Sequence, residues 1–182
     1  LAELTWALIM AAMRRLPQYI ANLKPGAWQQ SGLKAAAMPP NFNIGMKLEG
    51  KTLGIWGYGK VGQRIASYGR AFGMNVTVWG SEAARDKARA DGLLPAPARE
   101  AFFDVCDVLS LHLRLSDATR GIVTLDDLTR MKPTALFVNT SRAELIGEGA
   151  LVSALNRGRP GMAAVDVIET EDAIKLKAEL AG

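Results

Sequence analysis

The sequence predicts an α/β protein built on a doubly wound parallel sheet and preceded by a helical N-terminal segment. Two observations lead to this prediction. From Lys51 onward, short apolar runs of β type alternate with segments of helical periodicity, and this alternation is typical of parallel strands joined by right-handed helical crossovers. The first apolar run, residues 52–56, leads directly into Gly57-x-Gly59-x-x-Gly62 and a helical pattern. That order is typical of a Rossmann-type sheet.

Residues 1–50 are expected to form a helix and a wrapping loop within the same domain as the sheet. The run from Leu1 to Met13 is apolar, but Glu3 interrupts it and Arg14-Arg15 follow it. The run is too short to span a bilayer, and its charges lie on the wrong side for a signal peptide, so we predict no membrane association. Because the sequence starts inside an apparent helix, we expect that an upstream segment has been removed. One helical face is predicted to carry Leu1, Leu4, Leu8, Ala12 and Leu16.

Prolines and glycines punctuate residues 17–50, which we interpret as a helix pair and a long loop. A loop of this length is unusual unless it packs against something. The apolar side chains that a monomer would cover poorly are Trp6, Ile9, Met10, Trp28 and Phe42. We therefore predict a homodimer with a two-fold interface in this region.

Residues 51–168 are predicted to form the nucleotide-binding core, followed by a C-terminal tail at 169–182. Strands are expected at 52–56, 75–79, 107–112, 134–139 and 162–168, and helices at 60–72, 82–91, 98–104, 124–131 and 147–157. A sixth strand would have to be Gly92-Leu93-Leu94. Ligands on such sheets bind at the carboxyl ends of the strands, so the residues that follow each strand are the candidates for a site.

The glycine loop after the first strand has the residues that a pyrophosphate needs. Gly57 permits a tight turn, Gly59 lets the backbone approach the phosphates, and Gly62 lets the helix pack near the strand. The helix that follows offers free N–H groups and the positive end of its dipole. Tyr58, Lys60 and Val61 complete the predicted cofactor loop. The alternative is a strand–turn–helix unit in which the glycines serve packing alone.

The composition limits the possible classes of function. The chain has 182 residues, of which 49% are hydrophobic and 22% charged, which describes a soluble globular protein with a real core. The net charge of +4 is mild and no Lys/Arg run resembles a nucleic-acid patch, so we predict no nucleic-acid partner. The lone Cys106 cannot form an internal disulfide, which favours a cytoplasmic location.

Five stretches, in order along the chain, resemble the nucleotide-binding domain of the D-isomer-specific 2-hydroxyacid dehydrogenases, a family that includes phosphoglycerate and glyoxylate/hydroxypyruvate-type enzymes. They are LAELTWALIMAAMRR, LGIWGYGKVGQRIASYGRAFGM, DVLSLHLRLSDATRG, MKPTALFVNTSRAELIGEGALVSALNRGRPGMAAVDV and IETE. The resemblance implies an oxidoreductase that transfers a hydride between NAD or NADP and a 2-keto or 2-hydroxy acid.

The resemblance also implies roles for individual residues, and no metal. Arg142 matches the catalytic arginine, whose planar guanidinium can grip the substrate's carboxylate and carbonyl. Glu171 matches the glutamate that orients the catalytic histidine, although Asp172 stands where the family usually has proline. Asp166 matches the residue that contacts the nicotinamide carboxamide. The other residues expected beside the cofactor are Leu113, Arg114, Thr119, Thr140 and Ser141. Arg114 could equally face solvent.

The catalytic histidine of the family lies downstream of the Glu171 position, and the sequence given has none there. The only histidine, His112, ends the 107–112 run and matches a family position near the cofactor, not the general acid/base. The substrate-binding domain of the family, built from both ends of the longer chain, is likewise expected to be absent. We therefore expect this chain to bind the cofactor and to be inactive alone.

The choice between NAD and NADP depends on the end of the second strand. Dehydrogenases that prefer NAD carry an acidic residue there, about 20 residues past the glycines, to bind the ribose 2′-OH. Here that position is Gly80, with Ser81 next and Arg85 nearby. Loss of the carboxylate and a nearby guanidinium favour NADP slightly, whereas the charge of Glu82 argues the other way. Arg85 could equally be a solvated helix residue.

Two other functions are compatible with the same fold. One is a nucleotide-sensing binding module of co-repressor type, which some members of the family are. The other is an unrelated nucleotide-binding enzyme, because fold does not determine function. Arg142 favours the dehydrogenase, and the ordered matches through residues 134–168 disfavour an unrelated enzyme.

Overall fold

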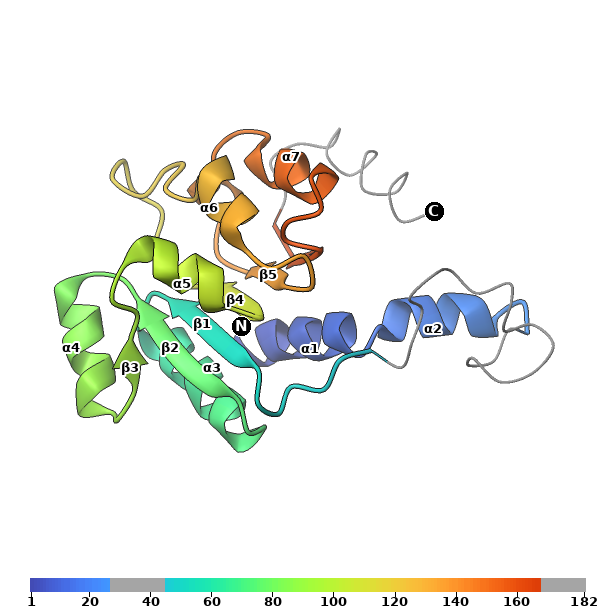
Figure 1. Ribbon diagram of the computed structural model, residues 1–182, viewed down its shortest axis with the longest axis horizontal. Helices are drawn as coiled ribbons and strands as arrows, with labels where there is room; N and C mark the ends of the chain where they lie inside the picture. Colours follow the sequence, from blue (N-terminus) through green and yellow to red (C-terminus); the bar gives the residue numbers. More distant parts are fainter. Residues whose placement is uncertain (27–44, 168–182) are drawn as a thin grey trace.

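A six-stranded parallel sheet forms the centre of the protein (Figure 1), as the computed structural model describes it for residues 1–26 and 45–167. The strand order is β3-β2-β1-β4-β5-β6 and every neighbouring pair is parallel. The strands are β1 (Thr52–Trp56), β2 (Asn75–Trp79), β3 (Leu94–Pro95), β4 (Val108–Leu111), β5 (Leu136–Asn139) and β6 (Met162–Val165). The predicted doubly wound, Rossmann-type sheet is therefore confirmed.

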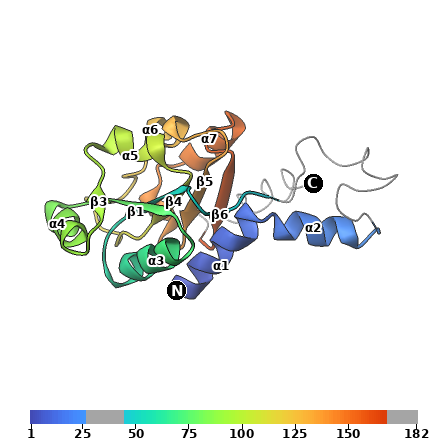
Figure 2. The same ribbon diagram turned by 60° about the horizontal axis from the view of Figure 1, so that its bottom comes forward.

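Helices cover both faces of this sheet. They are α1 (Ala2–Met13), α2 (Leu16–Leu23), α3 (Lys60–Ala71), α4 (Glu82–Ala90), α5 (Arg99–Val105), α6 (Leu125–Arg130) and α7 (Ala150–Asn156), with a short 3-10 helix, η2 (Ala143–Leu145). Figure 2 shows α5, α6 and α7 on one side of the sheet and α1 and α3 on the other. None of these helices, within the part of the chain that is described, is long and apolar enough to cross a membrane.

The edge strand β3 differs from its prediction. The sequence favours a strand at 92–94, but Gly92 adopts a left-handed turn at φ +75°, and the strand begins only at Leu94. Thr77 and Val78 of β2 pair with its two residues. A strand this short has almost no periodicity, so its position depends on pairing with β2 and not on its own sequence.

The buried face of α1 also differs from the prediction. Apolar side chains occupy nearly every position of this helix, so its periodicity does not select a face. The residues that it buries are Ala2, Thr5, Ile9 and Met13, whereas Leu1, Leu4 and Leu16 of the predicted face are exposed. The helix ends because Arg15 adopts positive φ, and Leu16 therefore begins α2 instead of extending α1.

The prediction that Ile9 needs a second subunit to cover it is wrong. Ile9 is fully buried within the chain. Trp6 lies against two rings of α3 and its C-cap, with centroids 5.7 Å from Tyr68 and 5.1 Å from Phe72. Met10, like Trp6, is partly buried against the apolar core that contains Ile9. Trp28 and Phe42 lie outside the described residues. The apolar side chains that remain exposed on α1, α2 and the residue before α1 are Leu1, Leu4, Leu16, Ile20 and Leu23.

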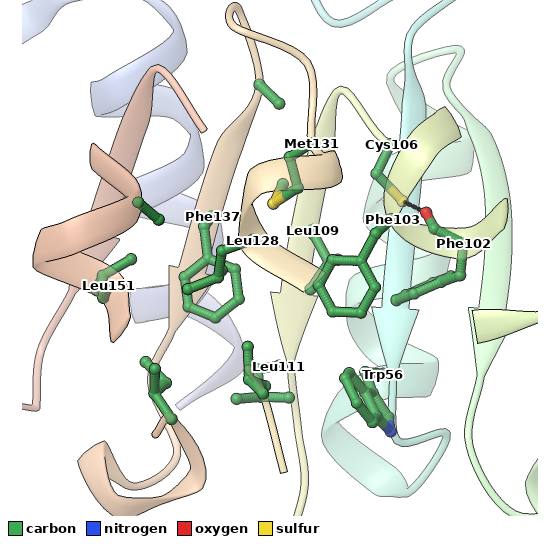
Figure 3. Packing of buried hydrophobic residues seen from close by; sticks show 14 of the residues in the cluster. Trp56, Phe102, Phe103, Cys106, Leu109, Leu111, Leu128, Met131, Phe137 and Leu151 are labelled. Carbon is green, nitrogen blue, oxygen red and sulfur yellow. Dashed lines mark hydrogen bonds between the residues drawn. The ribbon is translucent and has the colours of Figure 1, made fainter. Parts of the chain in front are cut away.

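The core on the α5–α7 side fixes the carboxyl end of β1 (Figure 3). Trp56, the last residue of β1, packs edge-on against Phe103 at 5.7 Å and Phe102 at 6.3 Å. Cys106 lies in the same cluster, where its thiol donates to the Phe102 carbonyl, and burial raises its pKa. The rigid aromatic group holds the Trp56 ring at the edge of the sheet where a ligand is expected.

Candidate functional site

The loop between β1 and α3 uses its three glycines for different reasons. Gly57 has φ +103°, and a methyl group added there would lie 2.5 Å from the His112 carbonyl oxygen. A methyl group at Gly62 would collide with the Gly57 carbonyl. By contrast, no described atom lies within 4 Å of the corresponding position at Gly59. Packing therefore explains Gly57 and Gly62, whereas at Gly59 the protein leaves open space beside the backbone, as the approach of a ligand would require.

Two hollows meet at this loop. The larger, which we call the wide cleft, has a volume of 740 Å³ and is lined by residues 59–63, 112–115 and 140–142, with Leu1 and Lys87. The second, which we call the tryptophan hollow, has a volume of 510 Å³ and is lined by residues 56–59 and 79–81, with Ala84, Arg99, Leu113, Thr119 and Ile122. Gly59 and Leu113 line both. The hollows lie where the strand order reverses between β1 and β4, which is where such sheets bind ligands.

Most of the predicted site residues line one of these hollows. The wide cleft contains Lys60, Val61, Gly62, Arg114, Thr140, Ser141 and Arg142, and the tryptophan hollow contains Gly57, Tyr58, Gly80, Ser81 and Thr119. Arg85 and Asp166 line neither. Glu171 lies outside the described residues.

The end of β4 places His112 in the wall of the wide cleft. Its amide donates to the Trp56 carbonyl at 2.8 Å, and its Nε2 lies 2.9 Å from the Ser110 hydroxyl. Burial lowers the pKa of His112 to about 4, so its imidazole is neutral at pH 7. A neutral, hydrogen-bonded ring of this kind suits a structural position in the cleft wall and not a cationic proton donor.

The end of β5 holds the loop that carries Arg142. Asn139 is fully buried; its Nδ2 donates to the Arg142 carbonyl and its Oδ1 accepts from the Ser141 amide, both at 2.9 Å. The Ser141 hydroxyl donates to the Leu111 carbonyl of β4, also at 2.9 Å. The loop thus has a defined shape before any ligand binds. Sequence reasoning missed the role of Asn139, although an asparagine ending a buried apolar strand is itself a signal.

A buried pair of hydroxyls ties α1 to the same loop. Thr5 and Thr140 are almost fully buried, and their Oγ1 atoms lie 2.7 Å apart. Thr5 also donates its hydroxyl hydrogen to the Leu1 carbonyl. Because a hydroxyl has one hydrogen to donate, Thr140 must be the donor to Thr5. Sequence reasoning missed Thr5 as well; the available signal was a polar residue within an apolar helix.

Arg142 presents an exposed cation to the wide cleft. Its Nη1 donates to the Ser141 carbonyl at 2.8 Å, and no described residue accepts from its Nε or Nη2. Asp166 follows β6 and is exposed; its amide points to the Asn139 carbonyl at 3.4 Å. Arg142 therefore keeps donors available for an anion that enters the cleft.

Three predicted cofactor residues use their side chains elsewhere. The Tyr58 hydroxyl donates to Asp91 at 3.0 Å, and burial together with this bond raises the pKa of Tyr58 to about 12. Ser81 caps α4 by accepting from the Ala84 amide. The Thr119 hydroxyl orders its own loop by donating to the Arg114 carbonyl at 2.7 Å.

The Arg85 side chain contacts residues of α4 and of the neighbouring strand β2. Its guanidinium pairs with Glu82 and lies 4.9 Å above the Trp79 ring. Gly80 adopts φ +153°, which favours glycine there and leaves the end of β2 without a carboxylate. Within residues 1–26 and 45–167, no group of three or more metal-ligand side chains is assembled.

Comparisons with known proteins agree with this geometry. The family described as D-isomer specific 2-hydroxyacid dehydrogenase, NAD binding domain, matches residues 6–180. A glyoxylate reductase from Aeropyrum pernix is 38% identical over 170 residues, which cover 93% of this chain and 50% of that protein. The structure of an oxidoreductase from Ralstonia solanacearum has 69% identity and a TM-score of 0.85, with 93% of this chain and 50% of that chain covered.

A phosphoglycerate oxidoreductase from Vibrio cholerae is also similar to this chain in sequence and structure. Its structure has 56% identity and a TM-score of 0.84, with 94% of this chain and 52% of that chain covered. The chain thus spans about half the length of these relatives. Because the family match covers nearly all of the sequence and includes the glycine loop and the β5 loop, the chain belongs to the NAD-binding domains of the D-isomer specific 2-hydroxyacid dehydrogenases.

Proposed function

We propose that this chain binds a nicotinamide dinucleotide and forms the cofactor-binding part of an oxidoreductase that interconverts 2-keto and 2-hydroxy acids. The observation that carries the proposal is the open space at Gly59, at the start of α3 and between the two hollows. A pyrophosphate fits there because the helix start supplies unpaired N–H groups and a positive dipole end. The adenosine then occupies the tryptophan hollow and the nicotinamide the wide cleft.

The residues around the wide cleft can orient an acid substrate. Arg142, held by Asn139 through its own carbonyl, offers a planar cation to a carboxylate. Asp166 is proposed to contact the carboxamide of the cofactor, and Glu171 to orient a histidine supplied from outside this sequence. When bound, the nicotinamide ring supplies the hydride acceptor or donor.

The proposal is tested by filling the space at Gly59. We expect Gly59→Ala to weaken NADH binding by at least about tenfold, because its methyl group would occupy the position of a phosphate, and to leave the melting temperature unchanged. Quenching of Trp56 and Trp79 fluorescence on titration with NADH measures the affinity. Gly147→Ala is the matched control, since a methyl group there meets only ordinary contacts beyond 3.5 Å. Equal NADH affinity of the two variants would contradict the proposal.

For the choice of cofactor, we propose a slight preference for NADP. The preference is supported by the absence of a carboxylate at Gly80. It is expected to be slight because Glu82 carries a negative charge and already pairs with Arg85, the cation that could bind a 2′-phosphate. Titration with NADPH and NADH, on the wild type and Arg85→Ala, measures it. Equal affinity of the wild type for both nucleotides would remove the preference.

We also propose that the chain forms a homodimer through α1 and α2. The support is α2, whose exposed Leu16, Ile20 and Leu23 recur at helical spacing, together with the exposed Leu4 of α1, because grouped exposed apolar side chains mark interfaces. Light scattering at micromolar concentration should give twice the mass of the chain, and a monomer would contradict this.

The relatives named above are enzymes, so the nucleotide-sensing alternative is not favoured. A cytoplasmic location stays a prediction from the lone cysteine.

A further inference from the structure

We propose that Arg99 determines specificity in the tryptophan hollow by recognising the adenine base of the dinucleotide. The inference rests on the proposed function and deepens it. Arg99 begins α5, two βα units after the glycine loop, and it belongs to none of the motifs noted in the sequence. It nevertheless lines the tryptophan hollow, which Arg85 does not.

The Arg99 side chain is held in one orientation by three hydrogen bonds. Nε donates to Asp127 Oδ1 at 2.9 Å, and Nη2 donates to the other Asp127 oxygen and to the Ile122 carbonyl. Asp127 is buried and is itself fixed by the capping box with Thr124 at the start of α6. A guanidinium held at one edge in this way is pre-organised, so little side-chain entropy is lost when its remaining donors bind a ligand.

Part of the Arg99 guanidinium remains available to a ligand in the tryptophan hollow. Cζ lies 5.0 Å from the centroid of the Trp56 ring, and the aromatic group around Phe102 and Phe103 keeps that ring in place. Among the described residues, none accepts a hydrogen bond from Nη1. An arginine has five N–H donors, so two of them are left to a ligand in the hollow.

The charge balance selects the chemical class of that ligand. The carboxylate of Asp127 neutralises Arg99 at close range, so the pair presents directed donors and a planar surface but no net charge. Adenine is neutral and planar, stacks on a guanidinium and accepts hydrogen bonds at its ring nitrogens, whereas a 2′-phosphate gains most from a cation that no carboxylate neutralises. The adenine base, rather than a 2′-phosphate, is therefore the part of the cofactor that Arg99 fits.

The test compares two ligands that differ in the adenosine half. The complete chain, as wild type and as Arg99→Gln, is titrated with NADH and with reduced nicotinamide mononucleotide, which has no adenine. We expect Arg99→Gln to lower NADH affinity about tenfold and to leave mononucleotide affinity unchanged. Arg130→Gln is the matched control, because Arg130 lies on α6, pairs with Asp104 at 3.9 Å and lines neither hollow; its NADH affinity should equal that of the wild type.

Because Arg99→Gln leaves Asp127 without its cation, Arg99→Lys is measured in parallel. Lysine keeps the charge beside Asp127 and loses the planar fork, so this variant should lose less stability than Arg99→Gln and still bind NADH several-fold more weakly. The inference is overturned if Arg99→Lys and any folded Arg99→Gln bind NADH as tightly as Arg130→Gln, if they weaken the mononucleotide equally, or if they weaken NADPH alone. A wild type that binds neither NADH nor NADPH would instead overturn the proposed function.

Discussion

At the scale of single residues, His112 shows how burial decides the chemistry that a side chain can perform. Its ordinary pKa of 6.5 would make it a proton donor near neutral pH, but burial lowers that value to about 4. In the unfolded chain the imidazole titrates at its ordinary value. Between these two values the unfolded state therefore binds a proton that the folded state does not. The resulting stabilisation is complete above pH 6.5 and is lost as the pH falls toward 4.

The difference between the folded and unfolded pKa values predicts that His112 makes the protein less stable in mild acid. The effect can be assigned to this residue, since the sequence contains a single histidine. Between about pH 7.5 and about pH 5, the wild type should lose on the order of 1 kcal/mol more free energy of unfolding than His112→Gln, a figure reduced for the partial exposure of the ring. Urea unfolding at the two pH values measures it. Parallel losses in both proteins would show that His112 titrates normally in the folded state.

At the scale of elements, α1 and the β5 loop are joined by a polar contact inside an apolar interface. Thr5→Val would leave the Thr140 hydroxyl without its acceptor, and an unsatisfied buried donor costs about 1–3 kcal/mol. Thr140→Val should cost less, because the Thr5 hydroxyl still donates to the Leu1 carbonyl. The double variant should recover most of the loss, because replacing both partners by apolar groups of the same shape is nearly neutral. Chemical denaturation of the four proteins gives the coupling energy; additive losses would mean that the two hydroxyls do not interact.

The same elements show which features could be predicted from the sequence. The β1–α3 unit is predictable because the apolar run, the glycines and the helical periodicity are all local, and the observed bounds differ from the expected ones by a single residue. Thr5 and Arg99 were not found, because each acts across elements distant in the sequence, on Thr140 and Asp127. The buried face of α1 was mistaken because an all-round apolar helix has no polar side to orient it.

At the scale of the whole molecule, two separate cores on opposite faces of the sheet hold one ligand-binding edge between them. The cluster under α5–α7 fixes Trp56, and through Asp127 on α6 it also fixes Arg99. The cluster under α1 and α3 fixes the glycine-loop helix, and Thr5 of α1 reaches the β5 loop. Both halves of the proposed cofactor site are thus supported by packed side chains without any further part of a longer protein, so the chain should bind the cofactor by itself.

Catalysis by the chain alone should nevertheless fail, because its single histidine, neutral at pH 7, is a poor proton donor. Reduction of a 2-keto acid needs a hydride and a proton, and the only histidine of the chain is neutral and partly buried in the wall of the wide cleft. Arg142 cannot give up a proton at ordinary pH, so it can orient a substrate but not protonate it. Mixed with NADH and glyoxylate, the purified chain should quench its tryptophans and leave the absorbance of NADH constant. Steady loss of that absorbance, absent without glyoxylate and abolished by Arg142→Gln, would show that a donor within this sequence completes the reaction.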